Sequence, residues 1–229
     1  MVHFNWTELI PGVGENIHVA TLIVASILML IMAVVGRLAL GRGEAAMMPA
    51  KSFGFKSMFE ATIEFIVSIC EMVIGEEGEK FVPFFATLFF FIFVSNLIGL
   101  LPGFTPPTDN VNTTFALGIF IFFYYNYLGI REHGVSYLKQ FMGPLVALAP
   151  LMFVIELVSH LVRPFSLGLR LFGNMVGDHT VLSLFLGLVP YYLLPVIFYG
   201  LGLFVCFMQA FVFTILSMIY VSMAISHDH

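Results

Sequence analysis

Residues 163–175 read RPFSLGLRLFGNM and place an arginine, Arg170, in the middle of a long apolar tail. The tail, residues 143–225, has only four charged side chains, which are Glu156, Arg163, Arg170 and Asp178. A guanidinium at membrane depth is unfavourable by about 3 kcal/mol even on the mildest insertion scales, and it does not lose its charge. Arg170 is therefore expected to act through its fixed charge, as a barrier to cations or as the partner of a carboxylate, and not as a proton carrier.

The composition indicates an integral membrane protein. Hydrophobic residues make up 60% of the 229-residue chain, charged residues only 10%, and the mean hydropathy is +1.01. Soluble domains carry about 25% charged residues. At about 20 residues per helical crossing, the length allows five or six spans and no large soluble domain. Cys70 and Cys206 lie far apart in apolar segments and suggest neither a disulfide nor a metal site, and no polybasic run suggests nucleic-acid binding.

Hydrophobic segments before the tail predict three spans, at residues 17–40, 81–101 and 113–130. Residues 57–75 differ from these spans because acidic residues recur on one helical stripe. The acidic residues are Glu60, Glu64 and Glu71. This pattern favours an amphipathic helix that lies at the membrane interface rather than a crossing.

The tail is too long for two perpendicular spans. As one straight helix, residues 143–187 would reach roughly 68 Å, against a hydrocarbon core of about 30 Å. A turn at GLVPYYLLP, residues 187–195, then precedes a second apolar helix over residues 196–225. We expect a single all-α membrane domain over residues 1–229, with about five spanning helices and one interfacial helix, in which residues 143–225 form a steeply tilted hairpin.

The basic residues predict the orientation of the chain. By the positive-inside rule, residues 42–80, residues 131–142 and the C-terminus face the cytoplasm, and the N-terminus and the loop before residue 113 face outward. The residues that set this orientation are Arg37, Arg42, Lys51, Lys56, Lys80, Arg131 and Lys139.

Six polar residues of the tail step along the chain by 4, 3, 7, 4 and 4, namely Glu156, His160, Arg163, Arg170, Asn174 and Asp178. A single polar residue in a membrane helix bundle often only forms a hydrogen bond to a neighbouring helix, which contributes about 1 kcal/mol to the packing. Six on one stripe, with both charge signs, favour an ion pathway. Glu156 has two candidate partners, His160 and Arg163. For Arg170, Asp178 lies about 12 Å away along a straight helix, too far for a direct pair, which leaves a partner on another subunit open.

RPFSLGLRLFGNM, together with MQAFVFTILSMIYVSMA at residues 208–224, resembles subunit a of the F-type rotary ATP synthase. The likeness covers residues 80–226 and is strongest in these two motifs. It implies a stator ion channel in which the arginine that matches Arg170 faces a ring of c subunits with midmembrane carboxylates. It also implies two offset half-channels, through which protons reach and leave the ring and drive rotation for ATP synthesis. Such a subunit is a non-catalytic component of its complex, with no cofactor or metal of its own.

The resemblance assigns roles to further polar residues. Positions that line or support the aqueous routes match Glu156, Asn174 and Gln209, and supporting polar positions match Arg163, Ser166 and Asn96. A fixed charge at Arg170 would favour the ionised form of a ring carboxylate and would repel a proton that passed straight between the half-channels.

The chain departs from the family pattern near one end of the expected route. His179 matches a position held by an acid or a histidine, but the position that often holds its ionisable partner is Gly202 here. Asp178, next to His179, is a candidate replacement. The histidines at 160 and 179 favour protons over sodium as the coupling ion.

Two other classes of membrane protein fit the sequence less well. An autonomous secondary ion transporter is the alternative, but the chain has no clear internal repeat. An intramembrane hydrolase is disfavoured because no nucleophile motif accompanies the histidines. The expected partners are the c ring, the peripheral-stalk b subunits, the remainder of the ATP synthase and membrane lipid, in the inner membrane of a bacterium.

Overall fold

The computed structural model describes residues 17–40, 54–101, 103–134, 137, 149–188 and 193–226, and all regular structure in these ranges is helical. Five of the described helices are long and apolar enough to cross a membrane. This confirms the predicted all-α membrane fold. In chain order the elements are α1 (Ile17–Leu40), α3 (Phe55–Ile74), the 3-10 helix η2 (Glu76–Phe81), α4 (Val82–Ile98), the 3-10 helix η3 (Pro107–Asp109), α5 (Val111–His133), α7 (Ala149–Leu188) and α8 (Leu193–Ile225).

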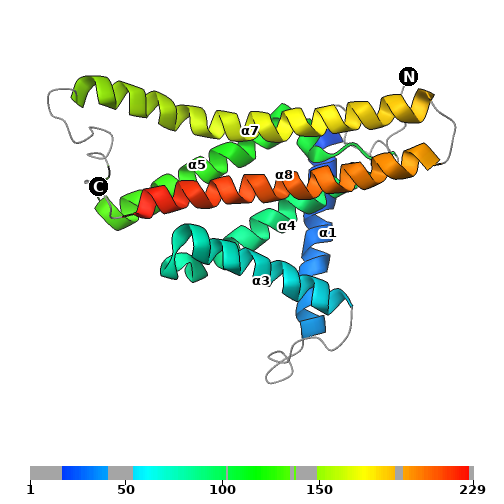
Figure 1. Ribbon diagram of the computed structural model, residues 1–229, viewed down its shortest axis with the longest axis horizontal. Helices are drawn as coiled ribbons and strands as arrows, with labels where there is room; N and C mark the ends of the chain where they lie inside the picture. Colours follow the sequence, from blue (N-terminus) through cyan, green and yellow to red (C-terminus); the bar gives the residue numbers. More distant parts are fainter. Residues whose placement is uncertain are drawn as a thin grey trace.

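Helices α7 and α8 lie side by side along the long axis of the molecule, and α1 runs across that axis (Figure 1). Helices α7 and α8 have 40 and 33 residues. They measure about 60 Å and 50 Å in length, well beyond the thickness of a hydrocarbon core of about 30 Å. If α1 crosses the membrane directly, α7 and α8 must be steeply tilted. The beginning of the expected hairpin, residues 143–148, and the middle of its turn, residues 189–192, lie outside the described residues, as do Arg42, Lys51 and Lys139.

Glycine and asparagine set the ends of the shorter helices. Helix α3 ends at Gly75, whose φ of 89° suits a residue without a Cβ atom. Helix α5 starts at Val111, two residues before the expected boundary, because the side chain of Asn110 accepts a hydrogen bond from the backbone N–H of Asn112 at 2.9 Å. A short 3-10 segment, η3, lies just before the first turn of α5.

The core lies where α4, α5, α7 and α8 meet. Its largest fully buried side chains include Phe85, Ile92, Tyr125, Leu171 and Phe213. In a bilayer the surrounding lipid is as apolar as these side chains, so close van der Waals packing must hold the helices together. Helix α3 joins this core through the buried Ile66 and Cys70 and through its last turn, where the hydroxyl of Ser222 on α8 donates to the carbonyl oxygen of Val73 at 2.9 Å.

Helices α5 and α7 approach each other through their backbones. A Cβ atom built on Gly118 would lie 2.6 Å from the carbonyl oxygen of Pro164, and one built on Gly168 would lie 3.2 Å from the carbonyl oxygen of Thr114. Only glycine fits so close a crossing. Because Gly168 is two residues before Arg170, this crossing fixes the part of α7 that carries the arginine.

Candidate ion-translocation site

Arg170 lies on the outer surface of the α7–α8 hairpin. Its neighbour Leu171 is fully buried, whereas Arg170 is exposed. Within the described ranges, Arg170 forms no ion pair or hydrogen bond. Three of the exposed residues one or two turns away on the same face are small, and they are Ser166, Gly173 and Gly177. The guanidinium is thus presented on a surface that another helix can approach closely.

One turn after Arg170, Asn174 connects the two helices of the hairpin. The Asn174 side-chain amide donates a hydrogen bond to the side-chain oxygen of Gln209 on α8. Gln209 is only 3% exposed, and its Nε2 has no hydrogen-bond partner among the described residues. Leaving a buried amide N–H without a hydrogen-bond acceptor costs free energy, so this position is suited to a water molecule.

His179 has a carboxylate partner that the sequence did not reveal. Its Nδ1 lies 3.4 Å from a carboxylate oxygen of Asp109, in η3. The candidate replacement for the missing partner, Asp178, instead has a carboxylate oxygen 3.3 Å from the position of a Cβ atom on Gly202. The same Cβ atom would lie only 2.6 Å from Cδ2 of Leu100, so glycine at 202 lets both the Leu100 side chain and the Asp178 carboxylate approach this turn of α8. One feature of the sequence could have pointed to Asp109. It lies in the loop that the positive-inside rule assigns to the outer face, and a hairpin that starts and ends on the cytoplasmic side turns near that same face.

A second polar pair joins η3 to α4. The hydroxyl of Thr108 donates to the side-chain oxygen of Asn96 on α4 at 2.7 Å, and both residues are fully buried. Asn96 Nδ2 and the hydroxyl of Ser95 have no partner within the described part of the chain. Polar atoms thus continue from η3 into the interior of the bundle.

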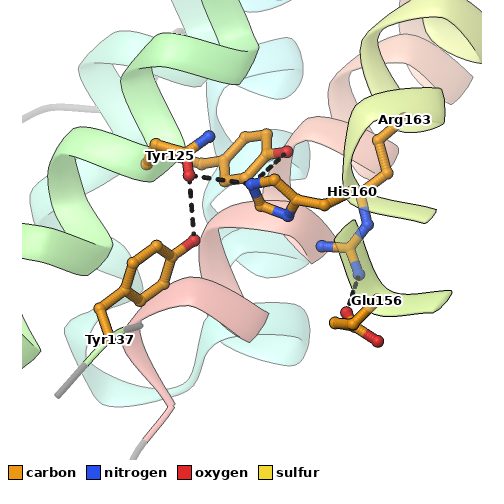
Figure 2. A network of polar contacts seen from close by, with 6 residues as sticks. Tyr125, Tyr137, Glu156, His160 and Arg163 are labelled. Atoms are coloured by element: carbon orange, nitrogen blue, oxygen red, sulfur yellow. Dashed lines mark hydrogen bonds and ion pairs between the residues drawn. The ribbon is translucent and has the colours of Figure 1, made fainter. Parts of the chain in front are cut away.

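On the other side of Arg170, the polar residues form a network between α5 and α7 (Figure 2). Arg163 donates to Glu156 at 3.4 Å, and its guanidinium carbon lies 5.5 Å from the centre of the Tyr220 ring. Of the two partners considered for Glu156, the structure thus pairs it with Arg163. The Glu156 side chain remains 45% exposed.

His160 turns toward α5. Its Nε2 lies 2.9 Å from the side-chain oxygen of Asn126 and 3.4 Å from the hydroxyl of Tyr125. The hydroxyl of Tyr137 donates to the same Asn126 oxygen at 3.3 Å (Figure 2). Burial raises the pKa of Tyr137, against a smaller opposing effect of Arg163, so its phenol stays protonated and keeps donating. The network ties α5 to α7 behind the Glu156–Arg163 pair.

Comparison with known proteins identifies the family. A family model described as ATP synthase A chain matches residues 5–222. The chain belongs to this family. It is 58% identical over 228 residues to ATP synthase subunit a of Bdellovibrio bacteriovorus, with 99% of each chain covered. It is 48% identical to the subunit a of Geobacter sulfurreducens, with 77% of this chain and 76% of the relative covered, and 49% identical with the same coverage to that of Trichlorobacter lovleyi.

Membership of the ATP synthase A chain family confirms the resemblance drawn from the two motifs. The chain is therefore an integral membrane component of an ATP synthase, from the membrane sector of that complex. The polar residues expected from its sequence fall into two groups on α7. Glu156, His160 and Arg163 come before Arg170, and Asn174, Asp178 and His179 come after it.

Proposed function

We propose that the chain is the stator ion channel of its ATP synthase. It passes protons to and from carboxylates of a c ring through two offset half-channels and couples this flow to rotation and ATP synthesis. The observation that carries the proposal is the exposed guanidinium of Arg170, which has no ion-pair partner among the described residues and lies in the middle of a helix long and apolar enough to cross a membrane.

An exposed guanidinium at this depth cannot simply face lipid. Its insertion would be unfavourable by about 3 kcal/mol or more, and it cannot be relieved by deprotonation. No described carboxylate of this chain pairs with Arg170. A carboxylate on a second subunit would offset the charge, and the exposed Ser166, Gly173 and Gly177 leave room for a helix that carries it. A ring of such helices, each with one acid, would meet Arg170 in turn.

The residues after Arg170 support an outer half-channel. The Asp109–His179 pair and Asp178 lie at its outer end, and the Asn174–Gln209 pair lies one turn from Arg170. The unpaired donors of Asn96 and Gln209 support water along this side, because buried polar atoms require partners. His179 and Asp109 together provide the acid–base pair for which Gly202 left no candidate in the return helix.

The residues before Arg170 support an inner half-channel. Glu156 keeps an exposed carboxylate while Arg163 holds it in place. Along α7, Glu156 lies about 21 Å before Arg170 and His179 about 14 Å after it, so the two groups are offset on opposite sides of the arginine. A proton that moved directly from one group to the other would have to pass the fixed positive charge, which opposes it. It must instead travel on a ring carboxylate.

The orientation and partners follow from the same proposal. The N-terminus faces outward and the C-terminus faces the cytoplasm of a bacterium, in its inner membrane. The ring occupies the Arg170 face of the hairpin, and the peripheral-stalk b subunits hold the chain against the torque of the ring. Protons are the coupling ion, because His160 and His179 lie in the two polar groups.

The test replaces Arg170 in the intact complex. Arg170→Ala is expected to abolish ATP-driven proton pumping and proton-driven synthesis while the complex still assembles, because the side chain makes no contact that holds the described chain together. Arg170→Lys should also fail largely, since lysine lacks the planar fork and loses its charge more readily when desolvated. Arg131→Ala, at an exposed arginine in the last turn of α5, is the control and should pump normally. An assembled Arg170→Ala complex that pumps at the native rate would refute the proposal.

A further inference from the structure

A groove lies between α1, α3 and α4, on the part of the protein that the ion route does not use. It holds about 730 Å³ of empty space, including its open mouth. The rings of Phe59 on α3 and Phe90 on α4 stack at 4.7 Å between centroids and line it. Met29 and Met32 on α1 and Val94 on α4 complete much of its apolar surface.

The groove has one charged lining residue. The only other polar side chain in it, Thr87, already donates its hydroxyl to the carbonyl oxygen of Pro83 at 2.7 Å. Arg37 lines one end, is exposed, and forms no ion pair within the described ranges. The groove therefore combines an apolar channel with a cation at one end that has no ion-pair partner among the described residues.

Two acidic residues of the neighbouring helix α3 lie near this groove, and neither forms an ion pair with Arg37. Glu60 of α3 is paired with Lys56 at 3.6 Å. Glu64 follows the lining residue Ile63 and is therefore rotated by about 100° around α3. The end of α1 that carries Arg37 is also the end that the positive-inside rule assigns to the cytoplasm, where anionic lipids attract basic residues.

The dimensions of the groove fit one lipid chain. From Arg37 to Met29 is eight residues of α1, or about 12 Å, which is close to half of a hydrocarbon core of about 30 Å. An extended acyl chain is much thinner than a helix, so one chain fits the length and width of such a groove.

We propose that this groove binds an anionic phospholipid of the cytoplasmic leaflet, with one acyl chain along Phe59 and Phe90 and the phosphate on Arg37. The apolar lining binds any acyl chain of this length. Selectivity comes from Arg37, because it offers a charge-assisted contact to a lipid with net negative charge and gains less from a zwitterionic one. The bound lipid would fill the wedge between the first span and the interfacial helix.

The test labels the intact ATP synthase complex in nanodiscs. One sample contains phosphatidylglycerol with a photoreactive diazirine near the end of one acyl chain, and the other contains phosphatidylcholine with the same chain. After illumination, mass spectrometry should locate the label on peptides that contain Met29, Met32 or Phe90. The phosphatidylglycerol label should exceed the phosphatidylcholine label about fivefold, which corresponds to about 1 kcal/mol for one basic residue next to an anionic lipid.

Two variants and one control sharpen the result. Arg37→Ala should reduce the phosphatidylglycerol label to the phosphatidylcholine level, and Arg131→Ala, at another exposed arginine on the same predicted membrane face, should leave it unchanged. Ala33→Phe adds a ring to the lining of the groove and should remove both labels from Phe90.

Three results would overturn the proposal. They are equal labelling of the groove by the two lipids in the native complex, an unchanged label in assembled Arg37→Ala complexes, and a photoreactive amino acid at position 33 that cross-links to a protein subunit in place of lipid. The comparison of the two lipids uses the native chain, so it decides the matter even if a variant fails to assemble.

Discussion

Replacement of Gly118 by alanine tests whether the crossing of α5 and α7 positions Arg170. The new Cβ atom would lie 2.6 Å from the Pro164 carbonyl oxygen, about 0.8 Å short of an ordinary contact of 3.4 Å. The atoms that it meets belong to the backbone of α7, so no side chain can turn away and the two helices must separate. Overpacking of this kind typically destabilises by about 1–3 kcal/mol, against a gain of up to about 1 kcal/mol from helix propensity.

We therefore expect a net destabilisation of about 1–2 kcal/mol in Gly118→Ala. The measurement is the fraction of complex that remains assembled after stepwise heating, followed by size-exclusion chromatography of a fluorescent fusion. Gly200→Ala is the matched control, because a Cβ atom at this helical glycine of α8 would meet no atom within 4 Å. It should be neutral or slightly stabilising.

The same substitution should impair function, because Pro164 and Gly168 lie on the turns of α7 just before Arg170. A displacement of about 1 Å at a reacting group can lower a rate about 100-fold, so a shift of about 0.8 Å should reduce ATP-driven pumping at least about tenfold. Gly200→Ala should pump at the native rate. If Gly118→Ala complexes show native heat resistance and native pumping, the close crossing does not position the arginine.

Three further predictions concern the route and the orientation of the chain. Asp109→Asn should lower passive proton conductance through the membrane sector about tenfold, because a charged hydrogen bond contributes about 1.5–3 kcal/mol; a native rate would exclude the Asp109–His179 pair from the route. A double-mutant cycle of Asn174→Leu and Gln209→Leu, read out as heat resistance of the complex, should give a coupling of about 0.6–1.7 kcal/mol, and strictly additive effects would contradict the bond between them. A cysteine at the exposed Asn112 should label from outside, and one at the exposed Glu132 should label only from the cytoplasm. A cysteine at Thr108 should not label, because that residue is fully buried. The native Cys70 and Cys206 are fully buried as well, so they give no background labelling. Labelling of positions 112 and 132 from the same side would refute a single crossing between them.

The local pattern of the sequence was sufficient to predict where the long apolar helices lie along the chain. The length of the apolar segments predicted the spans, and the excess length of the tail predicted a tilted hairpin, because the rise per residue and the bilayer thickness are both fixed. The charge of Arg170 could likewise be interpreted from the sequence, since no carboxylate on the same helix lies within reach of it. The family motif then connected that charge to a ring of carboxylates.

Contacts between helices depend on how each helix is rotated and offset against its neighbours, and no periodicity along one helix contains that information. The Asp109–His179 pair, the Asn174–Gln209 bond and the Gly118–Pro164 contact each join two separate segments. Only their packing in three dimensions shows that Asp109 is the partner of His179, and that the carboxylate of Asp178 lies next to Gly202. The sequence alone determined which residues carry charge in the membrane and where each helix runs, because these follow from side-chain chemistry and chain length. The tertiary structure decided which of the described charges are paired, and it leaves Arg170 exposed with no ion pair among them.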